Sequence, residues 1–305
     1  MNEDKLHQRC KKFLKQFKVK GETKIKLKDY DCDELAHFEE HGKADAQAKL
    51  EQGIELISEL QERLYASKKA GILIILQAMD AAGKDGAIKH VMSGVNPQGC
   101  CVTSFKTPSS EEHAHDFLWR CMPHLPERGM MSIFNRSYYE SVLVLKVHPE
   151  WLGAEGFSEA EIAKPERLFK QRYRSIRNLE EHLSCNKTKI IKIFLHLSEK
   201  EQKKRFLSRL DTPSKNWKLS SNDIKEREHW DDYQKAFEDC INATSSPEAP
   251  WLIVPADHKW FARLVCMAAI LEALLEIDPQ FPAVTEKQAA EFPQIRAALE
   301  ADKPD

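Results

Sequence analysis

The sequence predicts an α/β fold, in which a mostly parallel sheet of five strands is flanked by helices. Two observations lead to this prediction. Apolar runs of strand length alternate with longer segments whose apolar residues recur at helical spacing. The run at 72–76 contains only Ile and Leu, which is typical of a strand that is buried on both faces of a parallel sheet.

The expected elements follow one another along the chain as βαβ units. The strands are expected at 72–76, 102–105, 130–134, 190–197 and 251–254. The helices are expected at 37–70, 84–94, 110–122, 138–146, 160–184, 199–210, 221–242 and 257–277.

The domain organisation is interpreted as one α/β domain with flanking segments. Residues 1–36 are a polar leader of mixed local structure, 37–282 form the domain, and 283–305 are a C-terminal tail. Residues 212–220 join two strongly charged helices and interrupt the rhythm of strands and helices. We therefore expect an inserted helical lid at about 203–235.

Composition limits the classes of function. The 305 residues have an ordinary soluble composition and a formal net charge of -2, so any anion site must come from local clusters of Lys and Arg. No signal peptide is visible, the apolar runs are too short to span a membrane, and eight cysteines contain no C-x-x-C pair. We expect a cytoplasmic protein with no membrane and no nucleic-acid partner.

The first motif is the loop AMDAAGKDG at 78–86, which follows the first strand and precedes a helix. Gly83 and Lys84 match the phosphate-binding pattern G-x-x-x-x-G-K-[ST], whereas Ala78 and Asp85 depart from it. Small residues let backbone N–H groups close around a phosphate at a helix N-terminus. The predicted phosphate cradle contains Ala82, Gly83, Lys84, Asp85 and Gly86.

Asp80 requires its own explanation, because a carboxylate beside a phosphate is repelled. The conflict disappears if Asp80 binds Mg²⁺, which usually takes one or two carboxylates together with waters and phosphate oxygens. We therefore predict Asp80 as a metal ligand and Mg²⁺ as the cofactor, with Asp85 favouring the helix start electrostatically. The alternative is a plain strand-to-helix turn that Asp80 caps.

The second motif is NRSYYE at 135–140, at the C-terminal end of a predicted strand, where ligands bind in open α/β sheets. Arg136 is a candidate cation for phosphoryl oxygens. Asn135 stands where an acidic metal ligand is usual, and Glu140 supplies negative charge one turn later. The alternative is a capping box formed by Ser137 and Glu140.

The third feature is a basic lid. Residues 200–230 contain 9 basic and 5 acidic residues. Arg205 and Arg209 share a helix face, while Lys215 and Lys218 lie on the following loop, so all four are expected to close over phosphates. A solvated charged face is the alternative. Further candidate site residues are Asn135, Lys106, Arg120 and Asp223.

Seven motifs together resemble the family-2 polyphosphate kinases, over about residues 30–282. They are AMDAAGKDG at 78–86, VNPQG at 95–99, FLWR at 117–120, HLP at 124–126, NRSYYE at 135–140, PSKNWK at 213–218 and HWDDY at 229–233.

The resemblance implies a thymidylate-kinase-like P-loop core with a helical lid, and Mg²⁺-dependent phosphoryl transfer between polyphosphate and adenine or guanine nucleotides. It implies that Asp80 holds Mg²⁺, that Lys84 and Arg136 contact phosphate, and that the lid clamps the polyanion. The clamping residues would be Arg209, Lys215 and Lys218. Glu140 resembles the distinguishing acid of the subgroup that phosphorylates AMP as well as ADP. Members of the family also suggest a homodimer or homotetramer.

Two other functions stay open at this point. An ATP-dependent nucleoside monophosphate kinase on the same fold differs in its phosphoryl donor. A non-catalytic polyanion-binding module would bind without turnover, but it gains nothing from Asp80 beside Lys84. In all catalytic versions, positioning and charge neutralisation dominate the chemistry.

Overall fold

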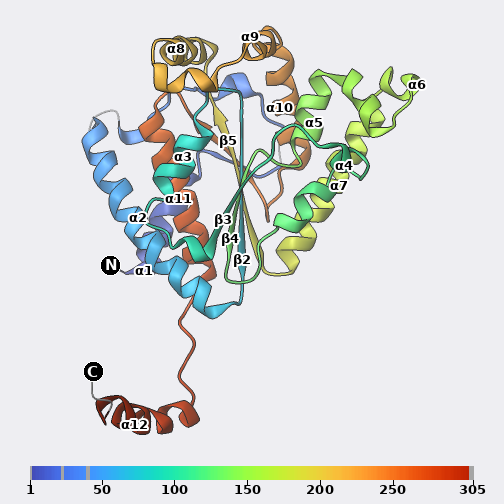
Figure 1. The fold of residues 1–305 in the computed structure, drawn as a ribbon. Coiled ribbons are helices and arrows are strands. Elements are labelled where there is room, and N and C mark those ends of the chain that lie inside the picture. Colours follow the sequence, from blue (N-terminus) through green and yellow to red (C-terminus); the bar gives the residue numbers. More distant parts are fainter. Residues whose placement is uncertain (1, 22–23, 39–41, 302–305) are drawn as a thin grey trace.

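The computed structural model describes residues 2–21, 24–38 and 42–301, and its fold is drawn in Figure 1. Within these residues one sheet of six strands has the order β1-β6-β5-β2-β4-β3. The strands are β1 (Lys18–Val19), β2 (Gly71–Ala78), β3 (Cys100–Ser104), β4 (Met131–Asn135), β5 (Thr188–His196) and β6 (Trp251–Pro255).

The mostly parallel sheet is confirmed, but the expected count of five strands is wrong. The five predicted strands all form and pair in parallel. The sixth, β1, has only two residues and lies antiparallel to β6 at the edge, with Lys18 opposite Leu252. Two residues carry no recognisable periodicity, so the pattern of the sequence could not indicate this strand.

Two helical layers cover the sheet (Figure 1). One face carries α1 (Glu3–Leu14), α2 (Gly42–Ser67), α3 (Lys84–Val91) and α11 (Lys259–Ile277). The other face carries α5 (Glu140–Val147), α7 (Glu166–Cys185) and α10 (Trp230–Thr244).

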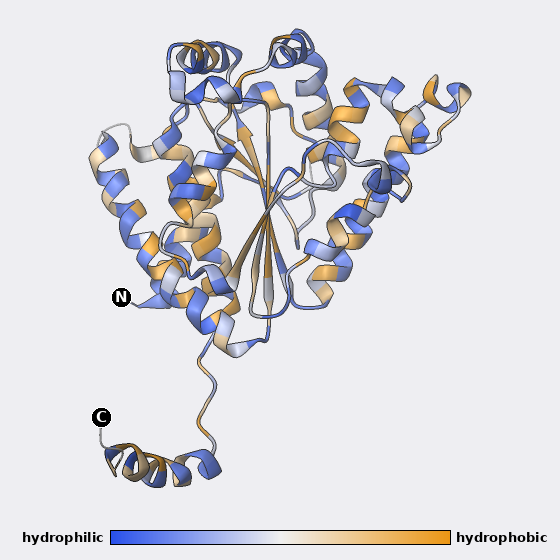
Figure 2. Cartoon of the chain, viewed as in Figure 1, coloured by the Kyte–Doolittle hydropathy of each residue, from blue (hydrophilic) through white to orange (hydrophobic). Residues whose placement is uncertain are grey.

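Each layer encloses its own buried apolar cluster. Ile72 and Ile74 of β2 point into the first cluster, whereas Leu73 and Ile75 point into the second. Burying one such side chain contributes roughly 1.5–3 kcal/mol. Figure 2 shows the result, with apolar strands in the centre and polar residues on the outer surfaces of many helices.

The remaining elements are short or lie outside the two layers. The α-helices are α4 (Ser110–His113), α6 (Glu159–Ile162), α8 (Glu199–Leu210), α9 (Ser221–Glu228) and α12 (Glu286–Ala301). The 3₁₀ helices are η1 (Leu27–Asp29), η2 (Ala36–Phe38), η3 (Pro97–Gly99), η4 (Trp119–His124), η5 (Pro149–Glu155) and η6 (Pro213–Lys218).

Three predicted helices are interrupted. The segment 110–122 divides into α4 and η4, and 160–184 divides into α6 and α7, which starts directly after Pro165. Proline is tolerated in the first turn of a helix but not in its interior. The segment 221–242 divides at His229, whose backbone is not helical. By contrast, the helix predicted at 199–210 is α8.

The flanking segments are more structured than a polar leader suggests. α1 packs beside α11, and Leu14 and Phe17 are buried. α12 is exposed along its length and lies away from the sheet in Figure 1. The predicted boundaries at 36 and 282 stay predictions, and parts of the predicted segments, residues 1, 22–23, 39–41 and 302–305, lie outside the described residues.

The predicted lid region contains α8, η6 and α9. Figure 1 places α8 and α9 beyond the end of the sheet to which the β5 arrow points. The loop between β2 and α3 opens at this same end, so the lid stands near the predicted phosphate cradle. Among the described helices, none has the length and apolar character needed to cross a membrane.

Candidate active site

The loop between β2 and α3 has the backbone of a tight strand-to-helix turn. Ala81 has φ 62 and Gly83 has φ 106. A residue with a Cβ would be strained at the position of Gly83. Lys84 starts α3, and its Nζ donates to the carbonyl oxygen of Ala78 at 2.9 Å. The ammonium of the lysine therefore lies at the start of the loop, and the phosphate cradle stays a prediction.

The ammonium of Lys84 is easier to deprotonate than an ordinary lysine. Burial is the largest cause, and the nearby Arg136 adds to it, while Asp80, Glu140 and Asp85 act in the opposite direction. The net result lowers the pKa of Lys84 to about 8. A phosphate bound beside the ammonium would favour its charged form.

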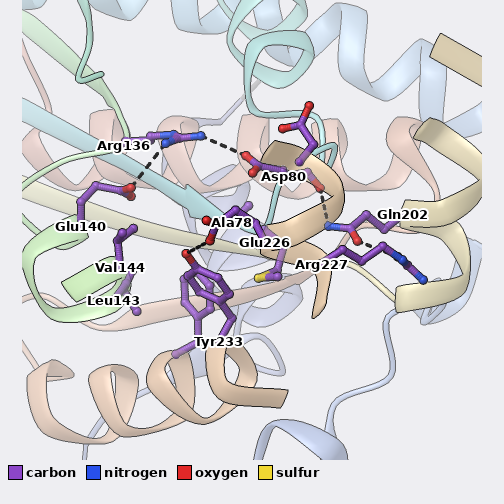
Figure 3. A pocket seen from close by; sticks show the side chains of 13 residues that line it. Ala78, Asp80, Arg136, Glu140, Leu143, Val144, Gln202, Glu226, Arg227 and Tyr233 are labelled. Carbon is purple, nitrogen blue, oxygen red and sulfur yellow. Dashed lines mark hydrogen bonds and ion pairs between the residues drawn. The ribbon is translucent and has the colours of Figure 1, made fainter. Parts of the chain in front are cut away.

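Arg136 joins two carboxylates at the mouth of the loop (Figure 3). Its guanidinium lies 2.9 Å from Asp80 Oδ1 and 3.6 Å from Glu140 Oε2. The side chains of all three are partly exposed, at 40%, 33% and 25%. A small molecule can therefore reach all three side chains from solvent. The guanidinium of Arg136 lies between the carboxylates of Asp80 and Glu140.

Sheet topology brings these groups together. β2 and β4 are parallel neighbours, with Leu76 opposite Asn135, so the residues that follow them leave the same edge of the sheet. Arg136 has φ 65, and its backbone N–H donates to the carbonyl oxygen of Leu76 at 3.1 Å. A non-glycine residue in this conformation is strained, and strain of this kind is often found where a side chain is aimed at a ligand.

Glu140 is held in a partly buried hydrogen-bond network. Gln77, in the amide orientation that satisfies both its ends, donates to Glu140 Oε1 at 2.7 Å and accepts from the Ser137 backbone N–H at 3.0 Å. Burial raises the pKa of Glu140, and the charges of Arg136 and Lys84 oppose that shift. Glu140 is thus a carboxylate whose protonation depends on the cations beside it.

The capping-box interpretation of Ser137 and Glu140 is wrong. α5 begins at Glu140, and its N-cap residue is Tyr139, which makes no side-chain cap hydrogen bond. The Ser137 hydroxyl instead accepts from the backbone N–H of Tyr139 at 3.2 Å. The Glu140 side chain is therefore directed at Arg136 and not at a helix end.

Asp85 connects the P-loop helix to both of the neighbouring motifs. Its carboxylate accepts hydrogen bonds from Asn135 Nδ2 at 2.9 Å and from Lys218 Nζ at 3.0 Å. Desolvation raises the pKa of Asp85, but these two hydrogen bonds, together with the charges of Lys218 and Lys84, outweigh it and leave that pKa below its usual value. Asn135 and Lys218 are thus placed at the cradle, although their contacts here are to Asp85.

Arg205 lies under the loop and not over it. The side chain is buried, and each of the five guanidinium N–H groups has an acceptor. The acceptors are Glu201 at 2.9 Å, the carbonyl oxygens of Ala81 at 3.1 Å and Ala82 at 2.7 Å, and those of Ala256 at 2.6 Å and Asp257 at 3.0 Å. Arg205 therefore has no donor left for a phosphate, and we expect it to position the loop.

The other lid candidates have looser surroundings. Arg209 Nη1 lies 3.5 Å from the carbonyl oxygen of Lys218, and Lys215 is exposed on η6. Their predicted contacts with phosphate stay predictions. Asp223 accepts from the backbone N–H of Ser220 at 2.8 Å at the start of α9 and also lines the cavity described below.

Lys106 and Arg120 form a separate pair. Arg120 lies 3.1 Å from Glu112 and donates to the carbonyl oxygen of Lys106 at 2.8 Å. Its guanidinium also lies over the ring of Phe105, 5.3 Å from the centroid. No contact joins either residue to the P-loop among the described residues, so this part of the structure does not bring them into the site.

A narrow cavity of about 50 Å³ opens beside Asp80, and sequence reasoning missed most of its lining. Gln202 of α8 donates to the backbone oxygen of Asp80 at 3.0 Å and accepts from Arg227 at 2.7 Å. Tyr233 donates to Glu226 at 2.6 Å. Figure 3 shows these side chains around the cavity. The one available signal was Gln202, three residues before Arg205 and thus on the same helix face.

The residues around Asp80 fit a magnesium ion that is shared with a substrate. No cluster of three or more His, Cys, Asp or Glu side chains suited to a metal exists in the described part of the chain. Mg²⁺ in phosphoryl-transfer sites needs only one or two carboxylates, because phosphate oxygens and waters complete its shell. The partly exposed Asp80 carboxylate, at the phosphate loop, would supply such a ligand.

Comparison with known proteins identifies the family. Residues 40–282 match the family model described as polyphosphate kinase 2. The chain belongs to the polyphosphate kinase 2 family. The resemblance seen in the sequence is therefore confirmed, and so are the P-loop kinase fold and the assignment as an enzyme.

Named relatives match this chain over nearly their whole length. An ADP-polyphosphate phosphotransferase from Rhodopseudomonas palustris is 48% identical over 93% of the chain and 98% of that relative. An AMP/ADP-polyphosphate phosphotransferase from Meiothermus ruber is 39% identical over 88% and 96%. The crystal structure of polyphosphate kinase 2 from Arthrobacter aurescens superposes with a TM-score of 0.82, at 37% identity, over 92% of this chain and 95% of that one.

Proposed function

We propose that this member of the polyphosphate kinase 2 family phosphorylates ADP to ATP and AMP to ADP from inorganic polyphosphate, reversibly and with Mg²⁺. The observation that carries the proposal is the arrangement of Asp80, Arg136 and Glu140 at the mouth of the P-loop. The names of the relatives from Rhodopseudomonas palustris and Meiothermus ruber support adenine nucleotides as acceptors.

The reaction is an in-line displacement at phosphorus. A terminal phosphate oxygen of the nucleotide attacks the end phosphorus of the chain. The bond from that phosphorus to its bridging oxygen breaks, and the electron pair leaves with the shortened polyphosphate. The attacking oxygen is already ionised, so the reaction needs alignment and neutralised charge more than a general base.

The chain's own cations neutralise that charge. Lys84 Nζ lies at the loop, 2.9 Å from the carbonyl oxygen of Ala78, and Arg136 lines the cavity beside Asp80, so both would contact the transferred phosphoryl group. Arg136 is held between Asp80 and Glu140 in this structure, so a phosphate competes with these acids for the guanidinium. Glu140 pairs with Arg136 and helps to orient its guanidinium. The part of Glu140 in accepting AMP is proposed from the resemblance to the subgroup that phosphorylates AMP as well as ADP.

Asp80 is the residue that would hold Mg²⁺. The ion supplies Lewis-acid stabilisation of phosphoryl oxygens when it is bound. The side chain of Gln202 donates a hydrogen bond to the backbone carbonyl oxygen of Asp80. This contact holds the backbone of Asp80, so its carboxylate stays beside the loop.

The experiment that tests the proposed function varies the nucleotide acceptor and supplies polyphosphate as the only phosphoryl donor. Purified protein is incubated with Mg²⁺, polyphosphate and AMP, ADP or GDP in separate reactions without ATP, and the nucleotides are separated. New ATP from ADP and new ADP from AMP support the proposal. Phosphorylation of AMP that requires ATP and ignores polyphosphate would identify an ATP-dependent nucleoside monophosphate kinase. Salt-sensitive polyphosphate binding without turnover would identify a polyanion-binding module.

We also propose a cytoplasmic homodimer or homotetramer, which the family resemblance suggests. Light scattering on the eluting peak of a size-exclusion column measures the molar mass. A mass of two or four chains supports this assembly, and a mass of one chain of 35.2 kDa contradicts it.

A further inference from the structure

The segment that follows α11 carries a large share of the exposed apolar side chains. Residues 281–299 hold five of the twelve large apolar side chains that are exposed among the described residues. Phe292, Ile295 and Leu299 stand three and four positions apart, so they share one face of α12. Their exposed fractions are 52%, 51% and 69%. A continuous apolar face in water generally indicates an interaction site.

A groove of about 600 Å³ lies between α1, α2 and α11. Most of its lining residues are apolar, and three basic side chains, Arg9, Lys12 and Lys49, line it as well. No acidic side chain lines it in the part of the chain that the structure describes. Lys49 already pairs with Asp45 at 2.7 Å, whereas Arg9 and Lys12 are exposed. The groove therefore fits an apolar segment that has negative charge beside its apolar face.

α12 complements this groove in charge and in length. The helix contains three acidic and two basic residues, and Glu291, next to Phe292, borders the apolar face. That face runs from Phe292 to Leu299, which is about 10 Å at 1.5 Å per residue. The groove follows α1 from Leu6 to Phe13, which is also about 10 Å. The apolar face of α12 thus matches the groove along its length.

The groove and α12 do not meet within one chain in this structure. Residues 279–285 join α11 to α12 without forming a helix, a strand or a turn, and Pro282 favours an extended backbone at Phe281. Figure 1 shows the result, in which α12 lies well away from α1, α2 and α11. Both α1 and α12 lie outside residues 40–282, the part that the family model matches. The reaction shared by the family therefore does not explain either feature.

We propose that α12 of one copy docks in the groove of a second copy, whose own α12 returns the contact. Phe292, Ile295 and Leu299 then face the apolar lining, and Glu291 lies beside the basic side chains of α1. Such reciprocal contacts form a closed pair with twofold symmetry. The seven linker residues, which span at most about 25 Å, let each α12 leave its own chain and reach the partner. The inference concerns assembly and goes beyond the proposed reaction.

The first test breaks each half of the contact in the full-length chain. Phe292→Asp with Leu299→Asp places charge on the apolar face of α12, and Arg9→Glu with Lys12→Glu reverses the charge of the groove. Light scattering over a range of concentrations measures the molar mass. Each double variant should dissociate, from two chains to one or from four to two. The dissociation constant of the pair should rise at least about 30-fold, the loss expected for one buried anchor of an interface.

Two matched controls make equal changes of charge on faces that do not take part in the contact. Ala290→Asp with Ala297→Asp adds two acids to the opposite face of α12. Lys11→Glu with Lys15→Glu reverses two charges beside α1 that do not line the groove. Both controls should keep the wild-type mass. All of the substituted side chains are exposed, and thermal unfolding shows whether each variant retains the fold.

A mixing experiment separates exchange between copies from docking within one chain. The groove variant keeps an intact α12, and the α12 variant keeps an intact groove. When the two are mixed, they should form a pair held by one of the two contacts, which neither variant forms alone. Native mass spectrometry with one variant isotopically labelled identifies this mixed pair. Docking of α12 within its own chain predicts no gain in association on mixing.

Three results would overturn the inference. The first is a wild-type mass of one chain at every concentration. The second is an equal mass of the α12 variant and its control, Ala290→Asp with Ala297→Asp. The third is a mixture of the groove and α12 variants that contains no mixed pair. The readout is mass and not turnover, so a failure of the proposed reaction would leave this test intact.

Discussion

Lys218 of the lid donates a hydrogen bond to the Asp85 carboxylate of the P-loop helix, at 3.0 Å across 133 positions of sequence. The carboxylate is 66% exposed and the lysine side chain 34% exposed. The lid therefore contacts the phosphate cradle through a charge pair that water can reach. A substrate phosphate would compete with Asp85 for the same ammonium group.

Lys218→Ala should lower kcat/KM for polyphosphate by about tenfold, because one charge-assisted contact to phosphate is lost. The melting temperature should hardly change, since exposed ion pairs contribute only about 0–1 kcal/mol. Steady-state kinetics and thermal unfolding measure the two effects. Lys170→Ala is the matched control, and equal activity of the two variants would refute a phosphate contact for Lys218.

Lys84→Ala should lower kcat by roughly 10²–10³, by analogy with the loss of one preorganised donor to developing charge. The nucleotide KM should change much less, because the ammonium faces the transferred group. Lys89→Ala, at an exposed position of the same helix, should retain wild-type kcat. Near-full activity of Lys84→Ala with polyphosphate and ADP would remove Lys84 from the mechanism.

Activity should fall on the alkaline side because the pKa of Lys84 is lowered to about 8. Below that pH the ammonium is charged and attracts phosphate, whereas above it the free enzyme loses the charge. A plot of kcat/KM for polyphosphate against pH should therefore bend downward near pH 8. In Lys84→Arg, any residual activity should show no such bend, since arginine stays charged; a bend at the same pH would assign it to another group.

Arg205→Gln should destabilise the protein, because the carbonyl oxygens of the loop lose a buried guanidinium. Breaking a buried charge pair of this kind costs roughly 3–5 kcal/mol. Chemical denaturation measures the loss, and Arg209→Gln, a less buried position on the same helix, should cost under about 1 kcal/mol. Equal stability of the two variants would contradict the positioning role of Arg205.

Much of the fold was predictable because its signals are local. β2, β5 and β6 consist mainly of apolar residues, and their burial in the sheet matches the strands that the sequence predicts. β1 was not predictable, since its two residues become a strand only by pairing with β6. The break at His229 was equally hidden, because one non-helical residue leaves the helical periodicity on both sides intact.

The residues of the candidate site also divide into those that the sequence predicts and those that only the structure shows. Asp80, Arg136 and Glu140 were predictable as site candidates because each motif follows a predicted strand, at the end of an open α/β sheet where ligands bind; the structure adds that the two strands, β2 and β4, are parallel neighbours. Gln202 reaches the loop, and Arg227 reaches Gln202, only through the tertiary position of the lid, which the sequence pattern does not contain. Arg205 and Arg209 look alike as charges on one helix face, and only burial assigns the first to the scaffold.

The central claim is that Asp80 carries a divalent ion between the enzyme and the phosphates. The most direct measurement is a crystal structure with Mn²⁺, ADP and a short polyphosphate, in which anomalous scattering locates the ion. We predict an anomalous peak in contact with the Asp80 carboxylate and phosphate oxygens, and Arg136 turned from Asp80 toward phosphate. An ion bound elsewhere, with Asp80 still paired to Arg136, would contradict the proposed chemistry.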